Sequence, residues 1–388
     1  MSVVGADPYM MHDPVTNSYY CYATGDNRHN HFLIYHSFDL IHYDFVGYAY
    51  NDLDEKNWGR TWFWAPEVYY NPNNKLYYLF YSAKVNKDLI KKYFLQRNFL
   101  ECCKLGVMVS SSPEGPFRNI TNEPMDFSPF DTRVARIKDI TKTPFSINER
   151  IEDVKKGVFV PAIDADLYFE DDGRIFLFFS RCCYINYVYD DKLHKYIEES
   201  NISVIELEND FWLDKEGKTM PRIKPEYMRT IDGHRKDTFN NIINYQNDPQ
   251  EWENAHVNDY ESSGFKKANR RWSEGSMVVK KFDKYYLFYS CNNFKNPYYG
   301  VGVAIADKIT GPYKKYEGNP VIAQDPSIPI YSTGHGSIVH KDDKLYYVFH
   351  GRKSVDEKRH VYSALLNIEK DKIYVSHITR GIKRRKVK

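Results

Sequence analysis

One phrase recurs five times along this chain, and it restricts the fold more than any other feature. Each copy is a run of aromatic and aliphatic residues that follows a short stretch of turn-forming residues. The copies span residues 19–23, 77–82, 175–180, 285–290 and 346–350. A turn followed by such a run is typical of the second strand of a β-hairpin. Because the runs are apolar throughout, we expect both faces of these strands to be covered.

A second phrase follows three of the copies and predicts a third strand in each unit. It spans residues 33–37, 106–113 and 302–307. Units of three to four strands repeated five times predict an all-β chain folded as a five-bladed β-propeller. A two-sheet sandwich is the main structural alternative, but it does not explain five copies of one phrase. Only residues 88–103 have a good helical pattern.

Two long polar stretches interrupt the repeats, at approximately residues 118–158 and 209–268. We interpret them as insertions within one domain that spans residues 1–388. They are either surface loops or walls and a lid around the mouth of a pocket, and the sequence does not separate these two interpretations.

Charge and hydropathy argue against nucleic acid and membrane as partners, and the cysteine content bears on the cellular location. The formal net charge is +2, which argues against a nucleic acid as partner, and the basic tail at 383–386 is expected to be a solvated chain end. No apolar run is long enough to cross a membrane, and the first residues lack the features of a signal peptide. We expect buried free thiols at all six cysteines, which favours a cytoplasmic location, with a secreted protein as the alternative. These are Cys21, Cys102, Cys103, Cys182, Cys183 and Cys291.

Three acidic residues each stand shortly before one of the repeated aromatic runs. They are Asp7, Asp164 and Glu274. Any one of them alone is most simply a surface acid. Their shared context predicts that the repeated fold brings them together at the inner ends of three blades. Carboxyl groups that converge in a pocket are the equipment for acid–base cleavage of a glycosidic bond.

Five motifs in order resemble the pattern of glycoside hydrolase family 43. They are Asp7-Pro8, Trp64-Ala65-Pro66-Glu67, Ile163-Asp164 with the turn at 171–173, Glu274-Gly275-Ser276 and Gly334-His335-Gly336-Ser337. The fourth motif departs from the family, which has proline where this chain has Ser276. The resemblance covers the whole chain except the two insertions, and it implies a five-bladed propeller.

The resemblance also implies a role for each acid. Asp7 would be the general base, Glu274 the general acid, and Asp164 the residue that orients the acid and raises its pKa. An inverting enzyme needs about 6.5–9.5 Å between base and acid, which leaves room for water. Asp166 lies two residues from Asp164 and is interpreted as a structural or substrate-side acid, because only Asp164 aligns with the motif.

The resemblance implies three substrate-binding residues, namely Trp64, Arg181 and His335. Trp64 would stack on a sugar or wall the pocket, with a core tryptophan as the alternative. Arg181 would contact substrate, with a surface arginine as the alternative. No cofactor is required; a structural calcium ion in the central channel is the one candidate, and His335 would be associated with it. His350 is interpreted as an inner-strand histidine, and His29 and His31 as rim or solvated residues.

We therefore expect an inverting exo-acting hydrolase that releases a terminal pentose from plant hemicellulose oligosaccharides. The activity would be that of a β-D-xylosidase, an α-L-arabinofuranosidase, or both, with an oligosaccharide as the only expected partner and the oligomeric state open. An arabinan- or galactan-cleaving enzyme of the same family is the first alternative. A non-catalytic carbohydrate-binding propeller is the second, since a fold does not determine a function. A retaining fructan hydrolase is disfavoured, because the residues next to the acids differ from those of that class. Here Ala6 precedes Asp7 and Gly275 follows Glu274.

Overall fold

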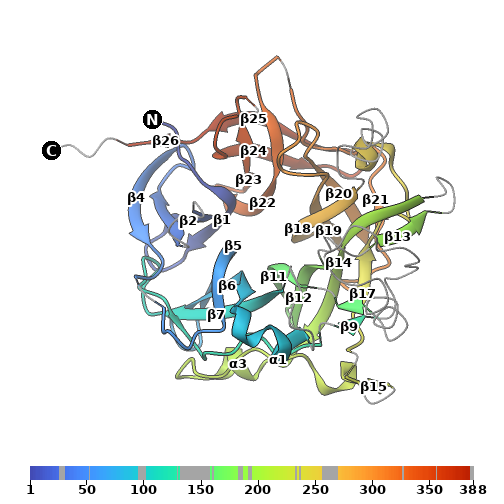
Figure 1. The fold of residues 1–388 in the computed structure, drawn as a ribbon. Coiled ribbons are helices and arrows are strands. Elements are labelled where there is room, and N and C mark those ends of the chain that lie inside the picture. The colour runs from blue at the N-terminus through green and yellow to red at the C-terminus, as the bar shows by residue number, and fades with distance from the viewer. Residues whose placement is uncertain are drawn as a thin grey trace.

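The structure of the protein is a computed structural model. The structure describes residues 1–384 except 26–30, 52, 95–101, 129, 132–157, 160, 182–186, 191–194, 232–233, 236, 256–269, 326 and 355. Within this part, sheets are arranged radially around a central axis, as in a β-propeller (Figure 1).

Three of the sheets are built on four antiparallel strands in chain order. The first contains β1 (Ala6–Asp13), β2 (Ser18–Thr24), β3 (Phe32–Ser37) and β4 (His42–Tyr48), and the second β5 (Gly59–Asn71), β6 (Leu76–Val85), β7 (Cys103–Ser110) and β8 (Arg118–Asn119). The third contains β22 (Tyr331–Lys341), β23 (Lys344–Arg352), β24 (His360–Ile368) and β25 (Ile373–Arg380).

The remaining large sheet has nine strands and joins two antiparallel groups. Its main path is β11 (Ile163–Phe169), β12 (Ile175–Arg181), β14 (Lys195–Leu207), β18 (Arg270–Lys281), β19 (Lys284–Cys291), β20 (Gly300–Ala306) and β21 (Lys314–Lys315). Off this path, β14 also pairs with β13 (Tyr187–Asp190) and β17 (Asn240–Ile243). The join is a parallel pairing of β14 with β18, in which Glu198 lies opposite Arg270. Because of it, the described strands form four large sheets where the repeats predict five separate blades.

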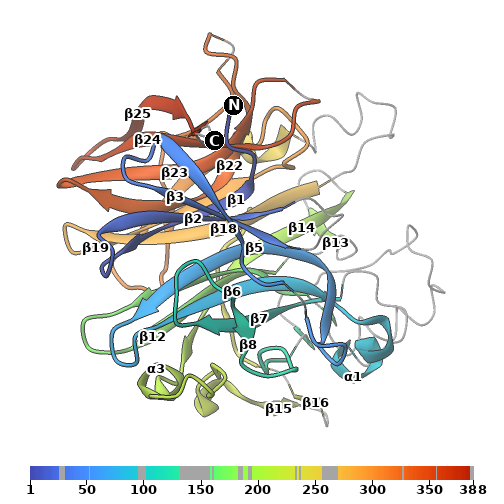
Figure 2. The same cartoon turned by 90° about the vertical axis from the view of Figure 1, so that its left-hand side faces the viewer.

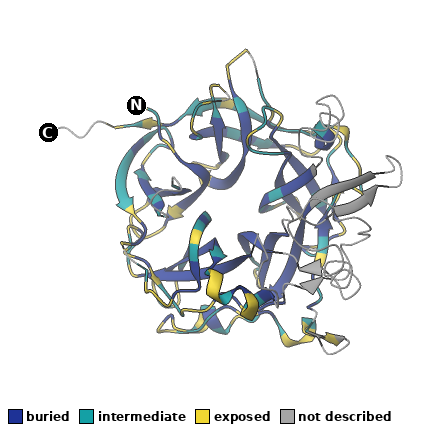
Figure 3. Ribbon diagram, in the orientation of Figure 1, coloured by how far each residue is buried: buried dark blue, intermediate teal, exposed yellow. Residues whose placement is uncertain are grey.

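The five repeated phrases lie on strands that occupy equivalent places. These strands are β2, β6, β12, β19 and β23, and each pairs with the strand nearest the axis in its group. Every residue of β2 and β12 is buried, which confirms the prediction that both faces are covered. Buried residues therefore predominate near the axis, while most exposed residues lie on the outside (Figure 3).

The ring is closed where the two ends of the chain meet. Strand β26 (Ile382–Lys383) pairs in parallel with β4, and Ile382 lies opposite His42. Next to the axis, the backbone N–H of Met10 on β1 donates a 2.7 Å hydrogen bond to Oγ of Ser337 on β22. Figure 2 shows both termini on the same side of the molecule. The first and last sheets thus hold each other at the edge and at the centre.

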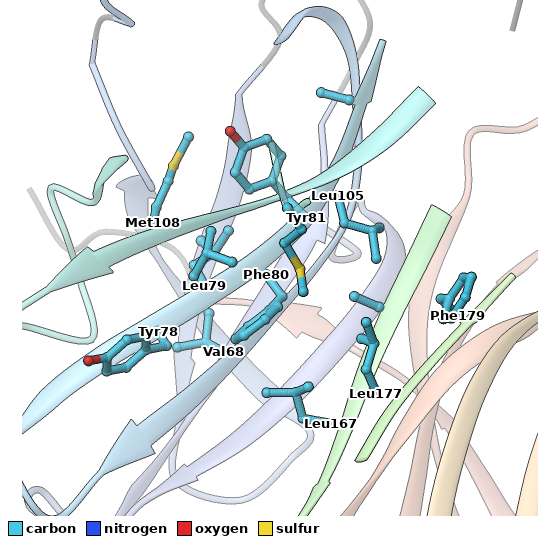
Figure 4. Packing of buried hydrophobic residues seen from close by; sticks show 14 of the residues in the cluster. Val68, Tyr78, Leu79, Phe80, Tyr81, Leu105, Met108, Leu167, Leu177 and Phe179 are labelled. Atoms are coloured by element: carbon cyan, nitrogen blue, oxygen red, sulfur yellow. The ribbon is translucent and has the colours of Figure 1, made fainter. Parts of the chain in front are cut away.

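The apolar core lies between neighbouring sheets and not in one central layer. The largest cluster lies between the second sheet and its neighbours, and Figure 4 shows part of it, with Val68 and Phe80 facing Leu167 and Leu177. Three further clusters fill the spaces between the following strand groups, including the two groups that the nine-stranded sheet joins. This packing explains the high content of aromatic residues, because each ring is covered by the next sheet.

The predicted helix at 88–103 is too long at its C-terminal end. The structure has a 3₁₀ turn, η1 (Lys87–Leu89), followed by the short helix α1 (Ile90–Phe94). Cys103 already begins β7, whose eight residues are all buried. The apolar residues after 101 therefore satisfy a sheet position, which overrides their helical spacing.

The two predicted insertions contain short elements, and each contributes one strand to a large sheet, β8 to the second sheet and β17 to the nine-stranded sheet. The first holds β8, β9 (Phe130–Asp131) and β10 (Val158–Phe159); the second holds α3 (Asp210–Leu213), η2 (Pro225–Tyr227), β15 (Thr230–Ile231), β16 (His234–Arg235), β17 and η3 (Glu251–Asn254). Arg235 of the second insertion forms 2.8 Å ion pairs with Asp126 of the first. The insertions are therefore attached to each other, and β17 belongs to the nine-stranded sheet.

The described cysteines are all buried, as predicted. Cys21 and Cys291 are buried free thiols and Cys102 and Cys103 are buried, while Cys182 and Cys183 lie outside the described residues. Among the residues that the structure describes, no helix has the length and apolar character needed to cross a membrane.

Candidate active site

The strand nearest the axis in every group carries a bulge at which a residue lies in the left-handed region. The residues at equivalent places and their φ angles are Asp7 (48°), Ala65 (47°), Asp164 (57°), Gly275 (58°) and His335 (42°). Strands β5 and β22 each have a second left-handed residue, Trp62 (57°) and Ser332 (51°). The register of the ladder shifts at each of these places. A bulge bends its strand and changes the direction of a side chain. Five equivalent bulges therefore turn side chains from five inner strands toward the same end of the axis.

Three of these residues, Asp7, Asp164 and His335, line a pocket of about 420 Å³. Its lining residues are Asp7, Trp62, Trp64, Ile163, Asp164, Trp272, Glu274, Asn292, Asn293, Phe294, Lys295, His335 and Arg359. The structure therefore brings together all three predicted acids, Trp64 and His335. None of the described residues of the two insertions lines the pocket, so the idea that they wall it finds no support there.

Asp7 is held as a carboxylate. Its Oδ1 lies 2.9 Å from a guanidinium nitrogen of Arg359, and its Oδ2 accepts a 2.8 Å hydrogen bond from the hydroxyl of Thr24. Burial acts to raise the pKa of Asp7, but the charges of Arg359 and His335 and the hydrogen bond from Thr24 outweigh it and hold the pKa well below its usual range. Asp7 is therefore ionised and suited to accept a proton.

The pKa of Asp164 is raised, in contrast to that of Asp7. It is 5% exposed, and its Oδ2 accepts hydrogen bonds from the hydroxyl of Ser180 at 3.1 Å and the backbone N–H of Gly275 at 3.3 Å. Burial, and then the neighbouring carboxyl groups of Glu274 and Asp7, raise the pKa of Asp164 to about 7. The bond to Gly275 connects Asp164 to the backbone that carries Glu274, which fits the predicted orienting role.

Glu274 is the least buried of the three acids, and both of its oxygens accept hydrogen bonds. The indole N–H of Trp272 donates to Oε2 at 2.7 Å, and the hydroxyl of Tyr299 donates to Oε1 at 2.6 Å. Burial is the largest cause that raises the pKa of Glu274, and the charge of Asp7 adds to it. Burial is therefore the main reason for the raised pKa of Glu274. The family resemblance instead implies like-charge repulsion from Asp164.

His335 lies among the three carboxyl groups. Its Nδ1 is 3.4 Å from Oδ1 of Asp7, and its backbone N–H donates a 2.6 Å hydrogen bond to Ser290. Burial acts to lower the pKa of His335, but Asp7, Asp164 and Glu274 raise it above its ordinary value. A protonated imidazole here offsets part of the negative charge that the acids bring into the pocket.

Two tryptophans form one wall of the pocket. The rings of Trp62 and Trp64 are stacked, with centroids 5.1 Å apart and planes 10° apart. The ammonium group of Lys84 lies 4.0 Å from the centroid of the Trp62 ring. Both tryptophans are only partly buried. Trp64 is thus a pocket residue and not a core tryptophan, as one of the two interpretations predicts.

Arg181 and Asp166 lie outside this lining. Arg181 is 1% exposed, and its guanidinium lies 4.7 Å from the ring centroid of Phe239, so it is neither the expected pocket residue nor a surface arginine. Arg181 is the last residue of β12, and Phe239 belongs to the second insertion. Asp166 is 2% exposed and has the Tyr69 hydroxyl 3.4 Å from its Oδ1, in agreement with the structural interpretation.

The histidines outside the motifs differ in position. His350 is fully buried on β23, and its Nδ1 accepts a hydrogen bond from the backbone N–H of Asp7 at 3.1 Å. His31 contacts the rings of Tyr48 and Tyr50 and does not line the pocket. His29 lies outside the described residues.

Several residues of the site could not be found by motif. Trp272 precedes Glu274 by two residues, and Trp62 precedes Trp64 by two, so alternation along a strand is a usable signal for both. Arg359 and Tyr299 come from loops far from any predicted acid in sequence. Only the fold brings them to Asp7 and Glu274.

The candidate calcium ion finds no direct ligand set among the described residues. They contain no group of three His, Cys, Asp or Glu side chains that could hold a metal ion. The Nδ1 atom of His335 faces Asp7 as an ion-pair partner, whereas Ca²⁺ takes six to eight oxygen ligands. The residues therefore do not fit a directly bound ion at His335.

The comparisons with known proteins agree on one family. Residues 1–373 match the family described as glycosyl hydrolases family 43. A solved thermostable family-43 glycoside hydrolase is 26% identical with a TM-score of 0.67, and the alignment covers 98% of this chain and 95% of that one. An endo-1,4-β-xylanase from Bacteroides thetaiotaomicron is 26% identical with a TM-score of 0.65, covering 99% and 98%.

A curated relative is more distant. It is a β-D-galactofuranosidase from Aspergillus niger, 22% identical over 302 residues, which are 76% of this chain. The chain spans 57% of the length of that relative. The family match extends over nearly the whole chain and includes the three acids that meet in the pocket, and the chain therefore belongs to glycoside hydrolase family 43.

Proposed function

We propose that this glycoside hydrolase is an inverting, exo-acting enzyme that releases a terminal pentose from plant hemicellulose oligosaccharides. Its activity would be that of a β-D-xylosidase, an α-L-arabinofuranosidase, or both. The observation that carries the proposal is the pairing of an ionised Asp7 with a Glu274 of raised pKa in one pocket. The proposal includes a propeller of five blades, with the β14–β18 pairing as the boundary between two of them.

In the proposed reaction, Asp7 takes up one proton and Glu274 gives up another. A water oxygen forms a bond to the anomeric carbon while one of its protons passes to Asp7. The bond between that carbon and the glycosidic oxygen breaks, and the leaving oxygen takes the proton of Glu274. Asp164 holds the backbone at Gly275, and His335 offsets the charge of Asp7. A single displacement of this kind inverts the configuration of the sugar.

The size and lining of the pocket support a short saccharide end as the substrate. A volume of about 420 Å³ lies in the lower part of the range of small-molecule sites. The partly buried Trp62 and Trp64 provide aromatic surface, which suits the apolar faces of sugar rings. A pentose is supported further by the similarity to the endo-1,4-β-xylanase, an enzyme named for a polymer of xylose.

A galactofuranoside is the second candidate substrate. It is favoured by the curated relative, which is named a β-D-galactofuranosidase. Arabinofuranose and galactofuranose share a five-membered ring, and they differ in the group attached beyond it. Rates on the two furanosides would separate the candidates directly.

The proposal is tested by hydrolysis of three aryl glycosides, the β-D-xylopyranoside, the α-L-arabinofuranoside and the β-D-galactofuranoside. We expect one pentoside to be the fastest, and both Asp7→Ala and Glu274→Ala to lose several orders of magnitude in kcat while the protein stays folded. An activated aryl leaving group should rescue Glu274→Ala more than Asp7→Ala, since it needs less protonation. The anomer of the first product, read by NMR, reports inversion.

Three results would contradict different parts of the proposal. Equal rescue of the two variants would remove the assignment of base and acid. Retention of configuration would remove the single displacement. No turnover of any glycoside by the wild type, on these three and on a wider panel, would leave a carbohydrate-binding propeller.

A further inference from the structure

Two buried rings hold the base and the acid from behind the pocket. Tyr299 and His350 are both fully buried, and neither lines the pocket. The hydroxyl of Tyr299 donates a 2.6 Å hydrogen bond to Oε1 of Glu274. On the other side, Nδ1 of His350 accepts a 3.1 Å hydrogen bond from the backbone N–H of Asp7. Each of the two reacting residues is thus held by one of these buried rings.

The two rings also contact each other. Their centroids lie 5.6 Å apart and their planes differ by 11°, which is a stacked arrangement. Tyr299 immediately precedes β20, and His350 lies on β23, so the contact joins two neighbouring strand groups. A continuous path of contacts therefore leads from the backbone of Asp7 through His350 and Tyr299 to the carboxyl group of Glu274.

The backbone next to Tyr299 leaves space for this arrangement. A Cβ atom at Gly334 would lie 2.3 Å from Cε1 of Tyr299, far inside van der Waals contact. Gly334 begins the motif that contains His335, and it has no left-handed φ that would by itself require glycine. The absence of a side chain at Gly334 is therefore explained by the position of the Tyr299 ring.

We propose that Tyr299 and His350 are a positioning pair that sets the place of the general acid relative to the general base. The inference rests on the proposed roles of Asp7 and Glu274. His350 fixes the backbone of Asp7 in its left-handed conformation, which is strained for a residue with a side chain. Tyr299, together with Trp272, fixes the plane of the Glu274 carboxyl group.

The Tyr299 hydroxyl has a further effect on the acid. A carboxylate can only accept hydrogen bonds, so a donor at Oε1 favours the ionised form that Glu274 reaches after it has given up its proton. Removal of this donor should therefore raise the pKa of Glu274. It should also let the carboxyl group turn about its last bond, which would slow proton transfer to a leaving group that requires it.

The first test compares Tyr299→Phe with a matched control elsewhere in the fold. The control is Tyr289→Phe, because Tyr289 is also fully buried and also donates to a buried carboxyl oxygen, Oε1 of Glu253, at 2.8 Å. We expect Tyr299→Phe to lower kcat on an alkyl glycoside by about ten- to a hundred-fold, the range of one hydrogen bond to a charged group. The alkaline limb of its pH profile should move to higher pH, while Tyr289→Phe keeps the wild-type profile.

The second test uses His350→Phe, which keeps a ring for stacking and removes the acceptor for the Asp7 N–H. We expect kcat to fall to a similar degree on alkyl and activated aryl glycosides, because the base is displaced and leaving-group chemistry does not compensate. Tyr299→Phe, in contrast, should be largely rescued by the aryl substrate. If the two variants respond alike to the leaving group, the division of roles within the pair is wrong.

A second route displaces Tyr299 without removing its hydroxyl. Gly334→Ala would push on the Tyr299 ring, and its control is Gly302→Ala, because a Cβ atom at Gly302 would lie 2.9 Å from Cζ of Tyr289. We expect the alkaline limb to move in Gly334→Ala and not in Gly302→Ala. Thermal unfolding of all five variants shows which of them are folded. Either Tyr299→Phe or Gly334→Ala, with its control, is enough to test the effect of Tyr299 on the alkaline limb.

The inference can fail separately from the proposed function. If the wild type hydrolyses glycosides but Tyr299→Phe has the pH profile and kcat of Tyr289→Phe, the positioning pair is refuted and the glycosidase remains. If the wild type hydrolyses no glycoside, the proposed function fails. Titration of ¹³C-labelled glutamate side chains by NMR then still decides whether Tyr299→Phe changes the pKa of Glu274; an unchanged value refutes the pair.

Discussion

Arg359 illustrates how one residue determines the protonation of the site. Its guanidinium lies 2.9 Å from Oδ1 of Asp7 and stacks over the ring of Phe294 at 4.5 Å from the centroid. Phe294 restricts the side chain from the other side, so the cation stays next to the carboxylate. This contact is the strongest of those that lower the pKa of Asp7, and it acts against burial.

Arg359→Met should raise the pKa of Asp7, because an opposite charge is removed from a buried carboxylate. A base must be ionised to work, so the acidic limb of the profile of kcat/KM against pH should move upward by about 1–3 units. The control is Arg380→Met, since Arg380 pairs with Glu357 at 2.6 Å and does not line the pocket. An increase of KM at every pH with an unmoved limb would instead make Arg359 a substrate contact.

At the scale of the element, the bulge is the device that builds the site. In β1, β11 and β22 the left-handed residue is itself a residue of the pocket, namely Asp7, Asp164 or His335. In β18 the left-handed residue is Gly275, directly after Glu274. A regular strand would send alternate side chains into the spaces between sheets. The bulge interrupts this alternation where the strand reaches the pocket.

Gly275→Ala should lower both the stability and the activity of the protein, whereas a glycine substitution at a left-handed position away from the pocket should lower only the stability. Gly275 has a φ of 58°, and a Cβ atom there would lie 2.8 Å from Cγ of His335. Gly173→Ala is the matched control, with a φ of 86° and no atom within 4 Å of the added Cβ. Both should lose about 1–2 kcal/mol in the free energy of unfolding from the left-handed backbone.

Only Gly275→Ala should also lose kcat, because it moves His335 and the acid next to it. Chemical denaturation and steady-state kinetics of the two variants check this expectation. Equal activity in both variants would mean that His335 yields to the methyl group without disturbing the site.

At the scale of the whole molecule, the protein has a second pair of buried carboxyl groups. Glu67 and Asp166 are 8% and 2% exposed and share Tyr69, which donates to Glu67 and lies 3.4 Å from Asp166. Burial raises the pKa of Asp166 to about 8, and burial followed by the charge of Asp166 raises that of Glu67. The folded protein therefore retains protons here that the unfolded chain releases.

This pair should make the protein less stable as the pH rises. Between about pH 4 and pH 8 the folded state binds more protons at Asp166 than the unfolded state does, so the free energy of unfolding falls across this range. Asp166→Asn removes that titration and should lose less stability between pH 5 and pH 8 than the wild type. Urea denaturation at several pH values measures it.

The control for this prediction is Asp307→Asn, because Asp307 is an exposed residue that pairs with Lys284 at 2.6 Å. It should follow the wild-type dependence on pH. If Asp166→Asn follows the same dependence as Asp307→Asn, the buried pair does not hold a proton in the folded state.

The sequence by itself determined the strands and the identity of the central acids. Short runs such as 175–179 are apolar at every position, and this pattern is local, so it predicts β12 without knowledge of its neighbours. The order of five motifs was likewise enough to point to Asp7, Asp164 and Glu274. All three lie in the pocket.

Only the tertiary structure decided what surrounds those acids. Arg359 is 352 residues from Asp7 in sequence, and Tyr299 is 25 from Glu274, yet each forms a direct hydrogen bond to its acid. It also placed Arg181 against Phe239 and joined β14 to β18. The physical reason is that strand formation depends on a local pattern of side chains, whereas charge, burial and ring contacts depend on which sheets become neighbours when the ring closes.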